Sequence, residues 1–439
     1  MKHFECALSR PVARVTGSSL GPYQTAVIRI GFAGTWLLFL LRELPHRAEL
    51  YGPDGPWSWD MARQLVDGND AFTALLWSDG RLWFELVYGL AILSSALLLL
   101  GWRTRTMSVL FMIGVLSIQN RSIFVGDGGD NVIHLMSIYL VLVRCGQVWS
   151  LDARRARRDR EAAESGAPIR PDVVGPVLWV VLGTALAVAG GMGRLGGGWL
   201  LILWGLWIAQ GLWWAANRYA PGGEQRALLD GFAHLAHNAA LFVIMAEACL
   251  IYATAGWYKI QGSRWQDGTA VYYPLHLDSF TPWPALSDAL ASHGLMVMLV
   301  TYGTVIVQVA FPFTLFNRRV KNVLLVAMIC EHAGIAVILG LPLFSLAMIA
   351  ADSVFLPTPF LRWLGRRVSL LTQRLRPGRA SARTEAVAEA VGPAARVTVP
   401  GPREREDGGE ALAAEDGSAV ASTAATTRDA ESDPGRDLG

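Results

Sequence analysis

The stretch Ala-Thr-Ala-Gly-Trp-Tyr-Lys, residues 253–259, ends an apolar run of the chain on a lysine. The run starts near residue 236, so as a helix it is long enough to cross a bilayer, which takes about 20 residues. Lysine is rare here, because among 38 Lys and Arg residues only Lys2, Lys259 and Lys321 are lysines. Two interpretations of Lys259 are open. It is either an anchor that extends from the helix end to water, or an amine that can lose its proton when desolvated.

The composition is that of a polytopic membrane protein. Charged residues make up 17% of the 439 residues and the mean hydropathy is +0.34, whereas soluble domains average about 25% charged residues. The formal net charge of +2 gives no reason to expect a nucleic-acid partner, so the lipid bilayer is the partner that composition predicts. We expect an all-α, polytopic integral membrane helical bundle of about ten spans. The predicted spans are 24–42, 82–101, 106–120, 130–148, 173–191, 197–215, 236–257, 293–316, 322–340 and 342–357.

The arginine clusters predict the orientation of these spans. With ten spans the arginine-rich turns fall on one side, among them 103–105, 154–160 and 362–367, and the positive-inside rule assigns that side to the cytoplasm. We therefore expect a multi-pass protein of the cell membrane with both termini cytoplasmic. The long segments 43–81 and 258–292 then lie outside.

The chain divides into three parts. We expect a cytoplasmic N-terminal segment over 1–20, a transmembrane domain over 21–360 and a disordered cytoplasmic tail over 371–439. The tail is rich in Ala, Gly, Pro, Ser, Thr and charged residues, so it cannot bury enough apolar surface to offset the entropy of ordering. Within the domain, the pair 173–191 and 197–215 is hydrophobic on all sides and predicts a lipid-facing hairpin.

Ionisable residues inside predicted spans are costly and are candidates for function. They are Arg29, Glu85, Asp130, His134, Glu247, Glu331, His332 and Asp352. Asp130 and His134 are four residues apart and share a helix face, with Asn131 beside them, at the outer end of the fourth span. Lys259 ends the seventh span on the same side, so we expect these four side chains to converge near the outer leaflet.

Structural interpretations of the same residues stay open. Asp130 and Asn131 are residue types that cap helix N-termini. Glu247 and His332 lie deeper, where they can pair with each other or with another buried partner. No motif such as G-x-S-x-G, a P-loop or H-E-x-x-H is present. His234 and His237 are three residues apart, but without acidic or Cys neighbours they do not predict a metal site, so we expect no bound metal.

Taken together these stretches resemble the HTTM family, the horizontally transferred transmembrane domain. This family is related to the vitamin K-dependent γ-carboxylase and to bacterial sporulation-delaying toxin maturation proteins. The resemblance covers about residues 20–360. It rests on Arg29, the turn Gly101-Trp102-Arg103-Thr104-Arg105, Arg121 followed by Asp130-Asn131, Ser150-Leu151-Asp152, Tyr252…Ala255-Gly256-Trp257-Tyr258-Lys259…Trp265-Gln266-Asp267-Gly268, and Glu331-His332 to Asp352.

The resemblance implies an active site on the outer face. In the carboxylases a lysine in the setting A-G-x-x-K…W-x-x-G acts as a base on vitamin K hydroquinone, and Lys259 stands at the matching position. It also implies assisting roles for His134, Asp130 and Asn131 and for His332, with a reduced quinone as cofactor. The carboxylases hold a propeptide on a large lumenal domain, whereas this chain ends in the predicted tail, so the implied partner is a small secreted peptide.

The functional expectation is therefore a bacterial HTTM-domain membrane protein with carboxylase-like or peptide-maturation activity linked to a reduced quinone. Two alternatives stay open at this point. One is a transporter or toxin-immunity factor that uses Glu247 and His332, because transporters also need buried acids and histidines. The other is a non-catalytic membrane scaffold.

Overall fold

The computed structural model describes residues 13–168, 171–220 and 222–374, with side-chain surroundings up to residue 372. Every secondary-structure element in these ranges is a helix, which confirms the all-α class. The chain divides into a unit Met1–Leu371 and a second unit Thr372–Gly439, and the core and cavities below belong to the first. The predicted tail, 371–439, lies almost wholly outside the described residues, as does most of the segment 1–20.

Seven helical segments in the described ranges are long and apolar enough to cross a membrane. They are α2 (Pro22–Glu43) continued by η1 (Leu44–His46) and α3 (Arg47–Tyr51), α5 (Arg81–Leu100), α9 (Val174–Gly191), α10 (Gly197–Tyr219), α11 (Glu224–Gln261), α14 (Gly294–Ala310) continued by η6 (Phe311–Thr314), and α15 (Arg318–Ile338). An eighth exists only if α16 (Pro342–Asp352) with η7 (Ser353–Phe355) and α17 (Thr358–Arg374), which are bent by 119°, form one broken span. These segments are compatible with a multi-pass membrane protein.

Three of the ten expected spans are shorter helices in the structure. The expected spans 106–120 and 130–148 are α6, Thr104–Gln119, and α7, Gly128–Leu140, with 16 and 13 residues. The expected span 342–357 is α16, with 11 residues. Each is shorter than the roughly 20 residues that cross a bilayer. Helix α6 ends before the polar pair Asn120-Arg121, α7 ends before turns whose carbonyls bind Arg29, and α16 ends before the bend to α17.

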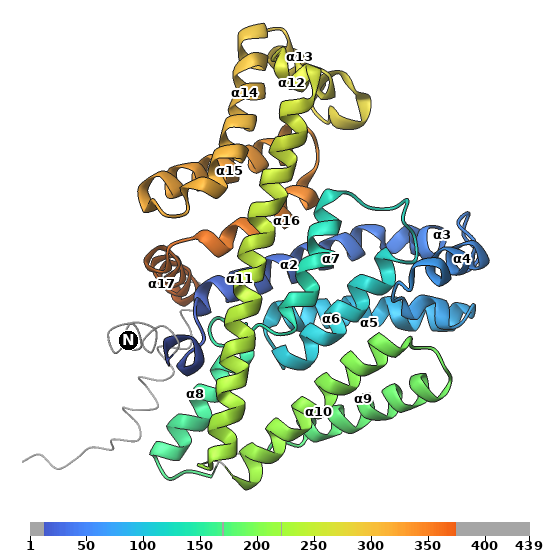
Figure 1. Ribbon diagram of the computed structural model, residues 1–439, viewed down its shortest axis with the longest axis vertical. Coiled ribbons are helices and arrows are strands. Elements are labelled where there is room, and N and C mark those ends of the chain that lie inside the picture. Colours follow the sequence, from blue (N-terminus) through green and yellow to red (C-terminus); the bar gives the residue numbers. More distant parts are fainter. Residues whose placement is uncertain (1–12, 169–170, 221, 375–439) are drawn as a thin grey trace, which may run out of the picture. The chain divides into compact units, whose positions relative to one another are not determined.

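Shorter helices connect these segments. They are α4 (Trp59–Asn69), η2 (Ala74–Trp77), α8 (Leu151–Glu164), α12 (Ser263–Gln266), η3 (Ala270–Tyr272), η4 (Pro274–His276), η5 (Asp278–Phe280) and α13 (Pro284–Ala291). The long helix α11 contacts α10 and α7 and, towards its C-terminus, α12 and α14 (Figure 1). Helix α14 in turn contacts α15, which packs on α16.

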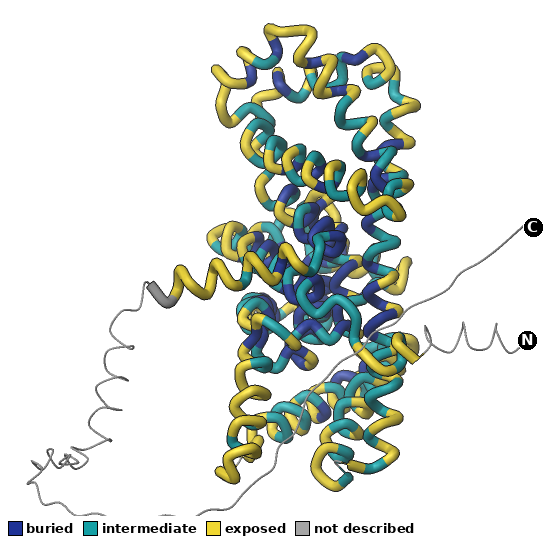
Figure 2. Tube along the Cα trace, turned by 90° about the vertical axis from the view of Figure 1, so that its left-hand side faces the viewer, coloured by how far each residue is buried: buried dark blue, intermediate teal, exposed yellow. Residues whose placement is uncertain are grey.

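Helix α2 forms the centre of the core. It packs against α5, α7 and α16, and its side chains Ile28, Phe32 and Trp36 are fully buried. Buried residues gather where these helices meet (Figure 2). The core is therefore built on the first predicted span.

Arg29 on α2 is fully buried. Its hydrogen-bond partners in the described residues are all backbone carbonyl oxygens. It donates to the carbonyls of Leu98 at 2.6 Å, Leu99 at 2.7 Å, Cys145 at 3.2 Å and Trp149 at 2.8 Å. The first two carbonyls belong to the last turn of α5, where carbonyls lack the usual helical partner; that of Leu98 also accepts from the amide of Gly101 at 2.9 Å. The other two belong to the turns after α7. Arg29 thus joins three parts of the chain.

The motifs around Gly101 and Asp152 meet at the same junction. Gly101 has φ +71°, and a Cβ there would lie 2.4 Å from the Cβ of Ser150, so only glycine fits this turn. Asp152 accepts hydrogen bonds from the backbone amides of Arg103 and Thr104, both at 2.8 Å. It therefore caps α6 from a distant part of the sequence.

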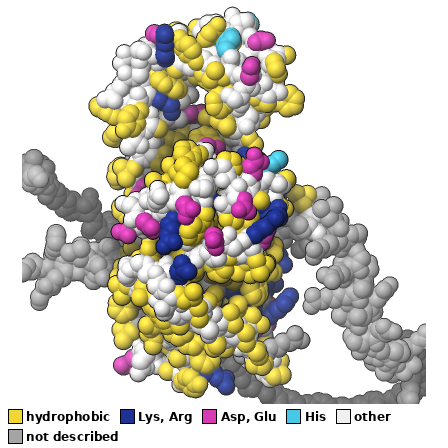
Figure 3. All heavy atoms as spheres, turned by 90° about the vertical axis from the view of Figure 1, so that its right-hand side faces the viewer, with side chains coloured by type: hydrophobic (Ala, Val, Ile, Leu, Met, Phe, Trp, Pro, Cys, Tyr) yellow, Lys and Arg dark blue, Asp and Glu magenta, His cyan; other side chains and the backbone are white. Residues whose placement is uncertain are grey.

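Helices α9 and α10 form the hairpin that the sequence predicts. The rings of Trp179 and Trp207 stack with centroids 3.9 Å apart, and each indole N–H donates to the other residue's carbonyl, at 3.0 and 2.8 Å. A Cβ on Gly183 would lie 2.6 Å from the Trp207 ring. The outer faces of both helices expose many apolar side chains. Hydrophobic side chains also cover most of the lower part of the face in Figure 3, below a band of charged residues.

Candidate functional site

Lys259 lies near the C-terminal end of α11 and turns into the bundle. Its Nζ donates a hydrogen bond to Oε1 of Gln308 on α14. The Nε2 of Gln308 then donates to Oε1 of Glu331 on α15 at 2.6 Å. The Nζ of Lys259 also lies 5.2 Å from the ring centroid of Trp265, which is close enough for a cation–π contact when the amine is protonated. An amide thus joins an amine to a carboxylate across three helices.

The local sequence explains this approach of the helices. A Cβ on Gly256 would lie 2.5 Å from Cγ2 of Val309, so the glycine lets α14 come close to α11. Gln308, the residue before Val309, is thereby brought within reach of Lys259, one turn further along α11. The glycine of the Ala-Gly-x-x-Lys motif therefore has a packing role.

A second cluster of side chains lies one level deeper. The hydroxyl of Tyr252 on α11 donates to Oδ2 of Asp352 on α16 at 3.0 Å, and it lies 3.0 Å from Nε2 of His332. When Asp352 is ionised, the single phenol proton goes to it, so Nε2 of His332 must donate to the phenol oxygen. Nδ1 of His332 is then an acceptor, and it is buried without a hydrogen-bond partner.

Both clusters border one cavity of about 470 Å³. Its polar lining includes Lys259, Gln308, Glu331 and His332, together with Thr304 and the ring of Trp265. Most other lining residues are apolar, among them Leu275, Val297, Val300, Ile335, Ile338 and Phe344. Glu331 and His332 are consecutive on α15, so they connect the first cluster with the second. The result is an apolar chamber with an amine, a carboxylate and an imidazole in its wall.

The three predicted residues on α7 do not line this cavity. Asp130 belongs to a capping box with Asp127: Oδ1 of Asp127 accepts from the amide of Gly129 at 2.7 Å, and Oδ2 of Asp130 accepts from the amide of Asp127 at 2.9 Å. The capping interpretation of Asp130 therefore fits the geometry, although Asp127 is the N-cap itself. Asn131 is exposed.

His134 has a partner of its own on a neighbouring helix. Its Nδ1 lies 2.9 Å from Oε1 of Gln119 on α6, and Nε2 of Gln119 donates to the carbonyl of Asp130 at 2.6 Å. The start of α7 packs on Phe344, since a Cβ on Gly129 would lie 2.7 Å from the Cα of that residue. The Phe344 ring lies 5.7 Å from the His332 ring. Phe344 therefore lies between the α7 residues and the cavity, and the expected convergence with Lys259 is not present.

Gln308, which links Lys259 to Glu331, is not among the residues predicted for the site. The available signal was a lone amide in an otherwise apolar helix, but its role depends on how α14 packs on α11. Tyr252 carries a clearer signal, because it lies seven residues before Lys259 and so shares its helix face. Glu247, the partner considered for His332, is not among the hydrogen-bond or ion-pair partners of that histidine, which binds Tyr252 instead.

Comparison with protein-family models, curated proteins and solved structures gives no match to this chain. The HTTM resemblance therefore stays a prediction from sequence motifs. What the structure adds is the arrangement of those motifs: one set at the Arg29 junction, one around the cavity of Lys259, and one at the start of α7.

Proposed function

We propose that this chain is a membrane enzyme of the HTTM type that carries out acid–base chemistry in the cavity of Lys259, with a reduced quinone as cofactor. In this proposal it serves a carboxylase-like or peptide-maturation reaction. The observation that carries the proposal is the chain of contacts from Lys259 through Gln308 to Glu331 in the wall of a largely apolar cavity.

The cavity suits a molecule with an apolar ring and a few polar substituents. Ligand pockets of about 300–1,000 Å³ with mainly apolar walls and a few convergent polar groups are typical of small-molecule sites, and this cavity has about 470 Å³. A reduced quinone fits that description, with its hydroxyls directed towards Lys259 and His332. When bound, it would supply an acidic hydroxyl and reducing equivalents.

The side chains of the cavity have distinct roles in this proposal. Lys259 accepts the proton of the bound hydroxyl, which arginine cannot do because its guanidinium stays protonated in proteins. Gln308 holds the amine in position and aligns it with Glu331. Tyr252 and Asp352 orient His332, whose Nδ1 is then free to accept a hydrogen bond. Lys259 and His332 are the proposed catalytic residues, and the other three are positioning residues.

The test is Lys259→Arg, which keeps the positive charge. We expect loss of function, measured by complementation of a deletion strain at equal protein level. The matched control is Lys321→Arg, because Lys321 on α15 donates to the backbone carbonyl of Phe355, and neither residue lines the cavity. It should complement fully. Full complementation by Lys259→Arg would overturn the catalytic role and leave Lys259 as a membrane anchor.

The cofactor is tested separately. The purified protein is extracted, and its bound quinones are measured by mass spectrometry. We expect Ile335→Trp, which fills the cavity, to remove them, whereas Val326→Trp on the exposed face of α15 should not. Equal quinone content in the wild type and both variants would overturn this cavity as the quinone site.

A further inference from the structure

A second cavity, of about 550 Å³, lies where the start of α6, the turns after α7 and helix α8 meet. Five arginines and one carboxylate border it: Arg103, Arg105, Arg144, Arg155, Arg160 and Asp152. It shares no lining residue with the cavity of Lys259. The excess of positive charge therefore belongs to a separate part of the molecule.

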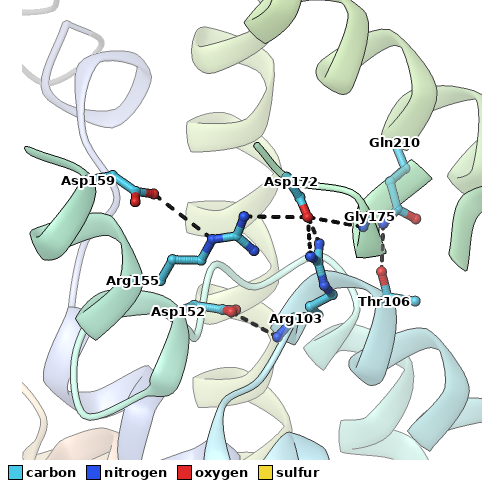
Figure 4. A network of polar contacts seen from close by, with 8 residues as sticks. All are labelled: Arg103, Thr106, Asp152, Arg155, Asp159, Asp172, Gly175 and Gln210. Carbon is cyan, nitrogen blue, oxygen red and sulfur yellow. Dashed lines mark hydrogen bonds and ion pairs between the residues drawn. The ribbon is translucent and has the colours of Figure 1, made fainter. Parts of the chain in front are cut away.

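The one lining carboxylate does little to neutralise these arginines. Both oxygens of Asp152 bind the start of α6. One accepts from the amide of Arg103 at 2.8 Å (Figure 4), and the other accepts from the amide of Thr104 at 2.8 Å and from its Oγ1 at 2.9 Å. Outside the lining, Asp172 pairs with Arg103 and, at 3.4 Å, with Arg155. Counter-charges therefore hold these two arginines at one edge of the cavity.

Arg144 also has an acidic partner, since its guanidinium lies 3.5 Å from Oδ1 of Asp230, but two of the five arginines do not. Within the described residues, Arg105 and Arg160 form no ion pair with a carboxylate. The guanidinium of Arg105 lies 4.2 Å from the ring centroid of Trp213, and Arg160 donates only to the carbonyl of Ala156 at 3.3 Å. Nε of Arg103 is buried without a partner. The cavity is thus rich in guanidinium donors that an anion would satisfy.

A third cavity, of about 340 Å³, adjoins this one and is almost wholly apolar. It lies between α5 and α6 on one side and the α9–α10 hairpin on the other, with Leu110, Ala185 and Leu203 in its wall. The apolar and arginine cavities share two lining residues, Thr106 and Gln210. Nε2 of Gln210 donates to Oγ1 of Thr106 at 2.6 Å (Figure 4). A cationic chamber and an apolar chamber therefore meet at one hydrogen bond.

We propose that these two cavities together bind one phosphate-bearing lipid, with the phosphate in the arginine cavity and a hydrocarbon chain between α6 and the hairpin. Guanidinium groups suit phosphate because their planar donors bind its oxygens in pairs. The adjoining apolar cavity favours a lipid over a soluble phosphate compound, since only a lipid occupies both chambers.

The headgroup part of the proposal is tested by binding to the purified, delipidated full chain, measured by native mass spectrometry. The probes are phosphatidylglycerol, which is anionic, and phosphatidylcholine, which is zwitterionic. We expect saturable binding of one phosphatidylglycerol, at least tenfold tighter than phosphatidylcholine. Arg160→Gln and Arg105→Gln should each weaken it severalfold, whereas Arg158→Gln, on the same helix as Arg160 but outside the cavity lining, should not. Equal affinity of all variants for phosphatidylglycerol would overturn the site.

The tail part of the proposal has its own variants, with inorganic pyrophosphate as a probe without a tail. Ala185→Trp fills the apolar cavity, and we expect it to weaken lipid binding while weak pyrophosphate binding is unchanged. Val188→Trp, on the exposed face of α9, should change neither. If pyrophosphate binds as tightly as the lipid and Ala185→Trp has no effect, the ligand is a soluble phosphate compound and the lipid proposal is wrong. Thermal unfolding of each variant checks that it is folded, and Arg160, an exposed residue, gives the least disruptive variant.

Discussion

Replacing Arg29 with methionine should destabilise the protein more than any other single change at a basic residue of α2. Methionine keeps most of the side chain's length but removes all donors, so four backbone carbonyls lose the guanidinium. A hydrogen bond from a charged donor contributes about 1.5–3 kcal/mol, but burying the charge offsets a large part of the sum. A buried acceptor that loses its donor costs about 1–3 kcal/mol, and several carbonyls lose theirs here, so we expect Arg29→Met to cost about 3–5 kcal/mol.

The assay is thermal unfolding of the purified protein in detergent. A loss of this size should lower Tm by an amount on the order of 10 °C. Arg42→Met is the matched control, because Arg42 lies on the same helix, its side chain is 57% exposed and its ion pair is with the adjacent Glu43. Exposed ion pairs contribute about 0–1 kcal/mol. If Arg29→Met and Arg42→Met unfold at the same temperature, the reasoning about the junction is refuted.

Three further predictions concern other parts of the chain. Arg103 lowers the pKa of Asp172 from 3.8 to about 2, so this stabilisation is present above pH 4 and is lost as the pH falls towards 2. In thermal unfolding, Asp172→Asn should therefore be less stable than the wild type at pH 6 and equal to it near pH 2, and a constant difference would contradict this. Gly101→Ala should cost about 1–3 kcal/mol, because φ is +71° and its Cβ would clash. Gly205→Ala has open space inside α10, so it should stabilise the protein by up to about 1 kcal/mol. With the native cysteines replaced, Ser263→Cys should react with an impermeant thiol reagent on intact spheroplasts, and labelling only after lysis would reverse the predicted orientation.

The long helices could be predicted from the sequence because each is a run of about 20 apolar residues with few charges. The limits of α6, α7 and α16 could not, since contacts with distant residues set them. The chain leaves the helical path after Leu140, and Arg29, more than 100 positions earlier, binds the carbonyls of the turns that follow. Hydropathy along the chain does not report such a partner.

The candidate site was predicted in part. Lys259 and His332 do line one cavity, and helical spacing alone places Tyr252 on the same face as Lys259. Gln308 escaped prediction because an amide in an apolar helix gains a role only through its neighbours. The α7 residues were expected near Lys259 from their depth in the membrane, but depth does not say which helices are adjacent.

The hydrogen-bond partners of the buried polar residues distinguish residues with a structural role from candidate catalytic residues. Arg29, Arg121 and Asp130 bind backbone groups: Arg121, for example, donates to the carbonyls of Gly52 at 2.7 Å and Trp57 at 2.9 Å. Such bonds satisfy loops and helix ends that would otherwise be costly to bury. The side chains around Lys259 and His332 bind one another, across three or more helices, where an apolar pair would serve stability at least as well. Burial alone would make all these residues functional candidates. The proposed site differs from the structural residues because its side chains bind one another around a cavity.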